Sequence, residues 1–150
     1  MEPRVNLSKS DPAAYAALLS MNKAASDSAD AAGIDPKLRE LLKVRASQIN
    51  GCTYCLRMHT RDALALGEST DRLAVVSAWA DSEYFTAVER AALALCESIT
   101  MISVDHVPHG VYTMARAVLS DEQISAVAWL SAAINMFNRV AITSRYPVKP

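Results

Sequence analysis

The sequence predicts an all-α fold, a compact domain of about six to eight helices, on three observations. Helix-start signatures recur along the chain: two Asp-Pro pairs and two capping-box patterns precede segments rich in Ala and Leu. Only four glycines are present to interrupt helices. No convincing period-two alternation of apolar residues indicates a strand, which leaves little room for a sheet.

The first two helices are predicted from their starts. Asp11-Pro12 is typical of an N-cap residue followed by proline at the first helical position, and it predicts a helix from about residue 12 to the late twenties. Gly33 marks the break that follows. Asp35-Pro36 repeats the pattern and predicts a second helix to about Ile49, with its apolar residues on one face.

Two further helices follow an interruption at Asn50-Gly51, since both residues tolerate the left-handed conformation that ends helices. One is expected from Cys52 to Leu66 and is closed by Gly67. The next is expected from about Thr70 to Trp79.

The second half of the chain contains both capping boxes. Residues 86–89 have this form before the apolar run AALALCESI, and residues 120–123 have it before a long last helix that ends at about Ser144. A shorter helix is predicted to begin near Pro108.

The composition is that of an ordinary soluble protein, with 51% hydrophobic and 21% charged residues. At 150 residues we expect a single domain, spanning 1–150. The net charge of −1 gives no basis for binding nucleic acid or an anionic membrane. No apolar run is long enough to cross a bilayer, no secretion signal is recognisable, and the three cysteines are an odd number, so a reducing cytoplasm is expected.

The segment NGCTYCLRMH, residues 50–59, holds two of the three cysteines and one of the three histidines. On a helix that begins at Cys52, Cys55 lies about 60° and His59 about 20° around the axis from it, so the three side chains share one stripe. Residues at i and i+3 have Cα atoms about 5–6 Å apart, within disulfide reach.

This placement favours redox chemistry, because unpaired N–H groups of a first helical turn stabilise a thiolate. The helix start favours Cys52 as the more acidic thiol, whereas a protonated His59 at i+4 favours Cys55, and the spacing does not decide between them. Two other interpretations stay open. Cys52, Cys55 and His59 supply three zinc ligands where a structural site needs four, and buried cysteines are often inert.

Residues 40–55, ELLKVRASQINGCTYC, continuing to His59 and to residues 63–68, resemble the AhpD-like alkylhydroperoxidase family of the carboxymuconolactone decarboxylase superfamily. The shared pattern is a glutamate, a CxxC motif that begins twelve residues later, then three residues and a histidine. The segments FTAVERAALALCESIT and AINMFNRVAITSRYP are also similar to this family, so the resemblance covers about residues 35–147.

The resemblance implies a compact helical domain that forms a homo-oligomer, a trimer or a hexamer, and that reduces organic hydroperoxides to alcohols. By position, Cys55 would attack the peroxide, Cys52 would resolve the sulfenic acid as a disulfide, and Glu40 and His59 would form the proton relay through water. An external dithiol, of the dihydrolipoamide type or thioredoxin-like, would restore the reduced state. No cofactor or bound metal is expected.

Other interpretations accompany this resemblance. Without it, Glu40 is a polar-face residue whose neighbour Lys43 at i+3 indicates a solvated ion pair. A carboxymuconolactone decarboxylase-like enzyme is a second candidate, although its chemistry has no evident need of a CxxC. A non-enzymatic zinc-binding or redox-sensing module is a third.

Overall fold

The computed structural model describes residues 2–150, and this part of the chain contains helices and no strand, which confirms the predicted all-α class. In chain order the elements are α1 (Leu7–Ser10), α2 (Pro12–Ala31), α3 (Pro36–Asn50), α4 (Thr53–Ala65), α5 (Thr70–Val75), the 3₁₀ helix η1 (Val76–Asp81), α6 (Ala87–Thr100), α7 (Ile102–Asp105), α8 (His109–Val118) and α9 (Asp121–Ser144). No helix in residues 2–150 is long and apolar enough to cross a membrane.

The helix starts follow the sequence signatures. The side chains of Asp11 and Asp35 accept hydrogen bonds from backbone N–H groups of the first turns of α2 and α3, each of which has proline in its first turn. Both capping boxes form, at the starts of α6 and α9. Gly51 ends α3 with φ of 67°, the left-handed conformation that glycine adopts without a steric penalty.

Three parts of the chain differ from the sequence prediction. The four-residue helices α1 and α7 were not predicted. The helix expected to reach Trp79 is α-helical only to Val75 and continues as η1. The guanidinium of Arg90 donates hydrogen bonds to the carbonyl groups of Trp79, Ala80 and Ser82, and these carbonyls are thereby satisfied without a regular α-helical ladder.

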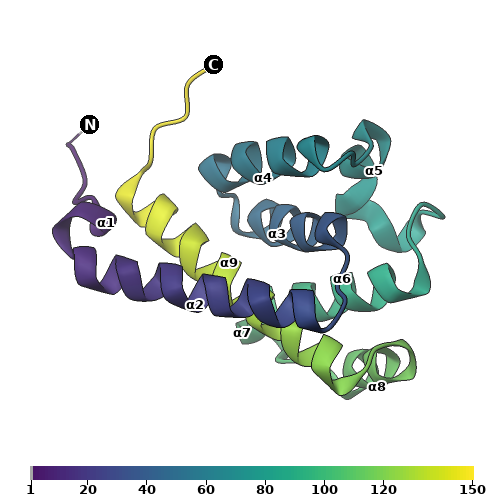
Figure 1. Ribbon diagram of the computed structural model, residues 1–150. Coiled ribbons are helices and arrows are strands. Elements are labelled where there is room, and N and C mark those ends of the chain that lie inside the picture. Colours follow the sequence, from purple (N-terminus) through teal and green to yellow (C-terminus); the bar gives the residue numbers. More distant parts are fainter. Residues whose placement is uncertain (1) are drawn as a thin grey trace.

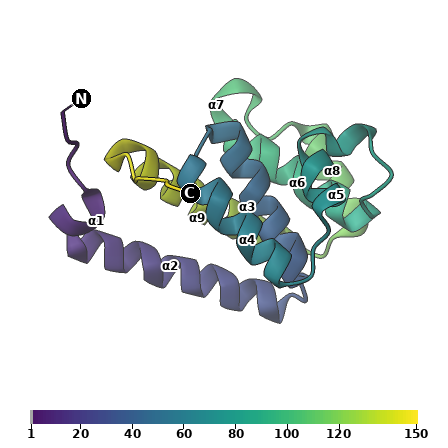
Figure 2. The same cartoon turned by 90° about the horizontal axis from the view of Figure 1, so that it is seen from above.

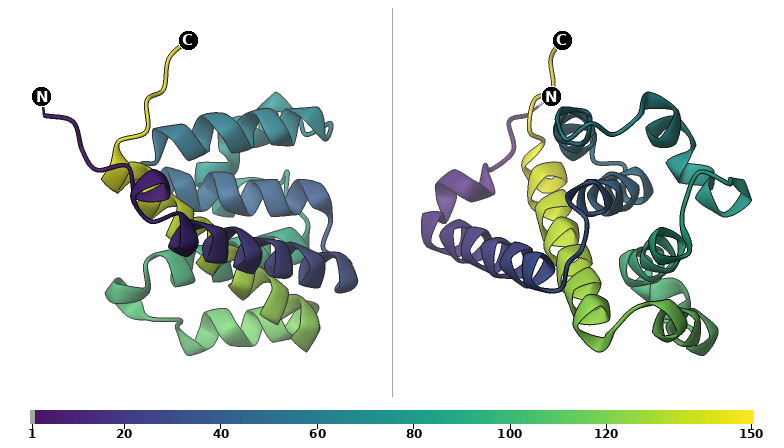
Figure 3. Two further views of the ribbon diagram at one scale, coloured as in Figure 1. Left: turned by 60° about the vertical axis from the view of Figure 1, so that its left-hand side comes forward. Right: turned by 45° about the vertical axis from the view of Figure 1, so that its right-hand side comes forward.

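Helix α3 lies at the centre of the domain and packs against α4, α6 and α9. The right-hand view in Figure 3 shows α4, α6 and α9 next to α3 on different sides. Helix α2 runs along the outside and packs on α9, as Figures 1 and 2 show from two directions. The central position of α3 is important for the site because α3 carries Glu40 and leads directly into the cysteine segment.

The hydrophobic core forms where α3, α6 and α9 meet. Its largest fully buried side chains include Leu41, Leu42, Leu93, Leu95 and Leu130. Burying one such side chain contributes roughly 1.5–3 kcal/mol relative to leaving it in water. The core therefore fixes the position of α3, the helix that ends beside the cysteine segment.

A buried polar network joins the end of α3 to α9. The Nδ2 atom of Asn50 donates to the Oδ1 atoms of Asn135 and Asn138, both at 2.9 Å. Asn138 in turn donates to the Oγ atom of Ser47 at 3.0 Å, and Asn135 donates to the Oγ1 atom of Thr100 at 3.0 Å. Because each partner is satisfied, the network holds the residue before Gly51 in one position.

The N-terminal segment lies against the end of α9, so both ends of the described chain are on the same side of the domain (Figure 1). The Oγ atom of Ser144 accepts a hydrogen bond from the backbone N–H of Leu7 at 3.0 Å. The hydroxyl group of Tyr146 donates to the Oγ atom of Ser8 at 2.9 Å. These contacts hold the segment after α9 against α1, and Tyr146 also packs on Tyr54 in the first turn of α4.

Candidate active site

The two cysteines of the CxxC motif lie at the start of α4 and form a disulfide, with Cα atoms 5.4 Å apart. Helix α4 begins one residue later than predicted: Cys52 is its N-cap residue rather than its first helical residue. The Sγ atom of Cys52 accepts a hydrogen bond from the backbone N–H of Cys55 at 3.4 Å. A sulfur in this position is stabilised as a thiolate when the disulfide is reduced, because the helix N-terminus carries partial positive charge.

Both cysteines are almost completely buried, with exposed fractions of 1% for Cys52 and 2% for Cys55. Nevertheless Cys55 forms part of the wall of a cavity of about 260 Å³ that we call the tyrosine pocket. The cavity gives Cys55 a route to a small molecule, so the sulfur is not sealed inside the core.

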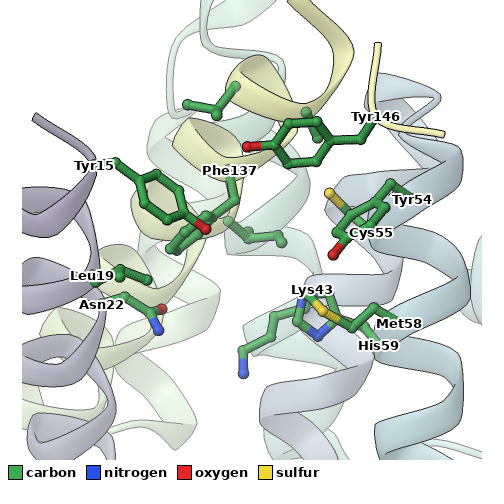
Figure 4. A pocket seen from close by; sticks show the side chains of 13 residues that line it. Tyr15, Leu19, Asn22, Lys43, Tyr54, Cys55, Met58, His59, Phe137 and Tyr146 are labelled. Atoms are coloured by element: carbon green, nitrogen blue, oxygen red, sulfur yellow. The ribbon is translucent and has the colours of Figure 1, made fainter. Parts of the chain in front are cut away.

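The tyrosine pocket lies between α2, α4 and α9, as Figure 4 shows. It is mostly apolar, and it is lined by Tyr15, Leu19, Asn22, Lys43, Tyr54, Cys55, Met58, His59, Ile134, Phe137, Val140, Ala141 and Tyr146. The hydroxyl groups of Tyr15, Tyr54 and Tyr146 point toward one central space in Figure 4. Burial, and then the neighbouring Tyr146 and Tyr54, raise the pKa of Tyr15, which therefore remains a neutral hydrogen-bond donor.

Aromatic contacts hold the walls of this pocket. The ring of Tyr54 meets the ring of Tyr146 edge to face, with centroids 5.1 Å apart. The ring of Tyr15 meets Phe137 in the same way at 6.4 Å. Such pairs contribute about 0.5–1.5 kcal/mol beyond the area that they bury. They connect α4 to the chain after α9, and α2 to α9.

His59 in α4 and Glu40 in α3 form a buried pair. The Nδ1 atom of His59 lies 2.8 Å from the Oε2 atom of Glu40, and the other carboxylate oxygen accepts from the Nζ atom of Lys43 at 2.6 Å. With Nδ1 held by the carboxylate, the Nε2 atom remains for exchange of a proton with a molecule in the pocket. Glu40 thus orients the imidazole as carboxylates do in other acid–base sites.

The acidity of Glu40 reflects opposing effects. Burial acts to raise the pKa of its carboxyl group, but the hydrogen bond from His59 and the charge and hydrogen bond of Lys43 outweigh it and lower the pKa below 4.5. Glu40 is therefore ionised at neutral pH. It is 8% exposed, so the solvated ion pair expected from its sequence context is wrong: Lys43 does bind it, in a buried setting.

The zinc interpretation is not supported by the geometry. Within residues 2–150, the His, Cys, Asp and Glu side chains whose ligand atoms all lie within 4.8 Å of one another are Glu40, His59 and Asp62. The set of Cys52, Cys55 and His59 does not converge in this way. The converging set lacks a fourth protein ligand, and Glu40 and His59 already bind each other.

Two of the four predicted site residues, Cys55 and His59, line the tyrosine pocket. Glu40 does not line it but binds His59, and Cys52 is bonded to Cys55. Sequence reasoning missed Tyr15, Lys43 and Tyr146 as pocket residues. Tyr15 lies outside the stretch 35–147 on which the resemblance was based, and it reaches the pocket only because α2 packs on α9. No local pattern in the sequence indicates such a contact.

Comparisons with known proteins agree with this arrangement. Residues 12–98 match the carboxymuconolactone decarboxylase family. The chain belongs to this family. Over 142 residues, this family member is 34% identical to the uncharacterized protein YdfG of Bacillus subtilis strain 168, covering 95% of this chain and 94% of YdfG.

Solved structures extend the comparison to the whole fold. A protein of unknown function from Agrobacterium tumefaciens, provisionally named antioxidant defence protein AhpD, has a TM-score of 0.89 and 32% identity, covering 99% of this chain and 100% of that chain. The apo form of the debrominase Bmp8 has a TM-score of 0.80 at 20% identity, covering 94% of this chain and 74% of Bmp8. The similarity to Bmp8 shows a shared fold alone. The expected membership in the AhpD-like part of the carboxymuconolactone decarboxylase family is thus confirmed.

Proposed function

We propose that this protein is a thiol-dependent peroxidase that reduces organic hydroperoxides to alcohols. One observation carries the proposal: the Cys52–Cys55 pair shares a pocket with an imidazole that a buried carboxylate orients. A nucleophilic sulfur, a resolving sulfur and a proton donor are the groups that this reaction requires. The name of the Agrobacterium tumefaciens relative also supports it.

In the first step the reduced Cys55 thiolate attacks the terminal oxygen of the hydroperoxide. A sulfur–oxygen bond forms, the oxygen–oxygen bond breaks, and the electron pair leaves on the alkoxide. His59 donates a proton to this alkoxide, and Glu40 stabilises the imidazolium form before transfer. The products are an alcohol and a sulfenic acid on Cys55.

In the second step the Cys52 thiolate attacks the Cys55 sulfur. A disulfide forms and hydroxide leaves, which takes up a proton to become water. The sum is one hydroperoxide and two thiols giving one alcohol, one water and one disulfide. The 5.4 Å separation of the Cα atoms lets the disulfide close with little backbone movement, and rapid closure protects Cys55 from oxidation to the sulfinic acid.

The walls of the tyrosine pocket favour an organic hydroperoxide over hydrogen peroxide. Leu19, Met58, Ile134 and Phe137 present apolar surface in front of Cys55. Each methylene group that a substrate buries there contributes about 0.8 kcal/mol to binding. A tyrosine hydroxyl group can donate a hydrogen bond to the peroxide oxygen.

The proposal includes partners. An external dithiol, of the dihydrolipoamide type or thioredoxin-like, is needed to reduce the Cys52–Cys55 disulfide after each turnover. We also propose a homo-oligomer, a trimer or a hexamer, which sedimentation of the purified protein tests directly. A sedimenting monomer at all concentrations would contradict that part.

Counting thiols tests the reaction itself. The fully reduced protein is treated with one equivalent of cumene hydroperoxide, the alcohol is measured, and free thiols are titrated after denaturation. The proposal predicts the loss of two of the three thiols with one equivalent of alcohol formed, and no loss of thiols in Cys55→Ser. Unchanged thiols in a folded wild-type sample would refute it.

A further inference from the structure

A second pocket lies beside the tyrosine pocket and is polar where the first is apolar. It has a volume of about 280 Å³ and is lined by Arg4, Gly51, Cys52, Thr53, Tyr54, Ala141, Ile142, Arg145 and Tyr146. We call it the arginine pocket. It shares Tyr54, Ala141 and Tyr146 with the tyrosine pocket, so these three residues form the wall between the two.

The two sulfurs of the disulfide divide between the pockets. Cys55 lines the tyrosine pocket and Cys52 lines the arginine pocket. A thiolate breaks a disulfide by attacking one sulfur while the other leaves. Attack from the arginine pocket therefore falls on Cys52 and expels Cys55, the sulfur that faces the substrate.

The arginine pocket is electropositive. Two guanidinium groups line it, and no acidic residue is among the lining residues of the described chain. Arg4 donates to the carbonyl groups of Ile142 and Thr143, which neutralises the negative end of α9. Arg145 is exposed, and neither arginine takes part in an ion pair within residues 2–150.

The start of α4 adds to this positive field. Gly51, Cys52, Thr53 and Tyr54 bring the first turn of the helix to the pocket wall. The N–H groups of a first turn have no acceptor within their own helix, and they attract negative charge. Together with the two arginines, this turn forms a site suited to a carboxylate.

We propose that the arginine pocket is the docking site of the reductant, and that it selects a small thiol that carries a carboxylate and attacks Cys52. The proposal rests on the peroxidase function above and names the chemistry of its second substrate. The hydroperoxide and the reductant then use separate pockets on either side of Tyr54 and Tyr146. Neither has to leave before the other binds.

A dithiol reduces the disulfide in two exchange steps. Its first thiolate forms a bond to the Cys52 sulfur, the Cys52–Cys55 bond breaks, and the electron pair leaves on Cys55, which becomes the thiolate for the next turnover. The second thiol of the reductant, as its thiolate, then attacks the reductant's own sulfur in the mixed disulfide, and the electron pair of the broken bond leaves on Cys52 as a thiolate. The reductant is oxidised to its cyclic disulfide, and the enzyme disulfide is reduced by two electrons.

Dihydrolipoate and dihydrolipoamide test the charge preference, because they carry the same two thiols and differ in a distant carboxylate or amide. Wild-type protein, oxidised with diamide, is mixed with each, and the rate of disulfide loss is measured. Dihydrolipoate should react faster than dihydrolipoamide. Arg145→Gln should lower the ratio of the two rates by about threefold, which is the effect of one exposed charge pair. Raising the salt concentration should also lower this ratio in the wild type, because salt screens the attraction between the carboxylate and the arginines.

Arg57→Gln is the matched control, because Arg57 is an exposed arginine of α4 that lines neither pocket. It should keep the wild-type preference. Equal rates for the two reductants in the wild type, or an equal effect of Arg57→Gln and Arg145→Gln, would overturn the proposal.

Filling each pocket separates the two half-reactions. Thr53→Trp, in the arginine pocket, should slow reduction by dihydrolipoate and leave thiol oxidation by cumene hydroperoxide unchanged, and Leu19→Trp, in the tyrosine pocket, should do the reverse. If Thr53→Trp does not fold, Ile142→Trp fills the same pocket from an exposed position. A Thr53→Trp or Ile142→Trp protein that is reduced at the wild-type rate would overturn the proposal.

The reduction assay starts from protein that diamide has oxidised, so it does not depend on the reaction with the hydroperoxide. A wild type that does not react with the hydroperoxide would refute the peroxidase function alone.

Discussion

The Nδ1 atom of His59 lies 2.8 Å from the Oε2 atom of Glu40, although the two residues belong to different helices and are 19 positions apart in the sequence. Both residues are buried to the same degree, each 8% exposed. A buried carboxylate that holds one imidazole nitrogen fixes the orientation of the ring, and leaves the other nitrogen for chemistry.

Replacing His59 should separate proton transfer from disulfide closure. In His59→Ala, consumption of cumene hydroperoxide should slow by about a hundredfold, because the alkoxide leaves without a positioned acid. Closure of the disulfide with diamide should keep its wild-type rate, since that reaction needs no proton on an alkoxide. Equal slowing of both reactions would show that His59 has only a structural role.

Glu40 should make stability depend on pH. Its pKa is lower in the folded chain than its ordinary 4.5, so the unfolded chain binds the proton more readily. The stabilisation is fully present above pH 4.5 and is lost as the pH falls through the folded value. The difference in the free energy of unfolding between the wild type and Glu40→Gln, from urea titrations, should therefore shrink as the pH is lowered below 4.5. A difference that grows on acidification would contradict this assignment.

Cys96 should be the unreactive third thiol. It is completely buried, and burial raises its pKa to about 11, against a smaller opposing effect from the hydroxyl groups of Ser131 and Thr100. At about pH 8 the reduced native protein should therefore expose two thiols to a maleimide, and three only after unfolding. Cys96→Ala should leave the native count at two. Labelling of Cys96 in the native protein would disprove its inertness.

The asparagine network should be a major source of stability near the site. Asn138 is fully buried and bonds to both Asn50 and Ser47, so Asn138→Ala removes the donor to the buried Ser47 hydroxyl group and one of the two acceptors of Asn50. We expect a loss of about 2–3 kcal/mol in the free energy of unfolding. Met136→Ala, on an exposed part of the same helix, is the control and should change stability by less than about 0.5 kcal/mol. A similar loss in both variants would contradict the role of the network.

The sequence was sufficient for the features that depend on neighbouring residues. The Asp-Pro pairs, the capping boxes and Gly51 predicted the helix boundaries to within one or two residues, because each acts on the turn beside it. The CxxC spacing at a helix start also predicted the separation of the two Cα atoms. Helix η1 was missed because Arg90, from another helix, binds its carbonyl groups.

Contacts between distant segments could not be derived from local patterns. Glu40 has the sequence context of a solvated ion pair. Only the family resemblance paired it with His59, in a relay through water, whereas the structure shows a direct contact. Tyr15 and Arg4 lie before the stretch that resembles the family, and the packing of α2 and of the N-terminal segment on α9 brings them to the two pockets. Such contacts depend on how whole helices pack, which no window of the sequence specifies.

The sulfur that attacks the hydroperoxide is the central point of the mechanism, and trapping its sulfenic acid tests it most directly. Reduced Cys52→Ser and Cys55→Ser proteins are treated with one equivalent of cumene hydroperoxide in the presence of dimedone, and the adduct is located by mass spectrometry. We expect an adduct on Cys55 in Cys52→Ser and none on Cys52 in Cys55→Ser. An adduct on Cys52 alone, or on neither cysteine, would contradict the mechanism.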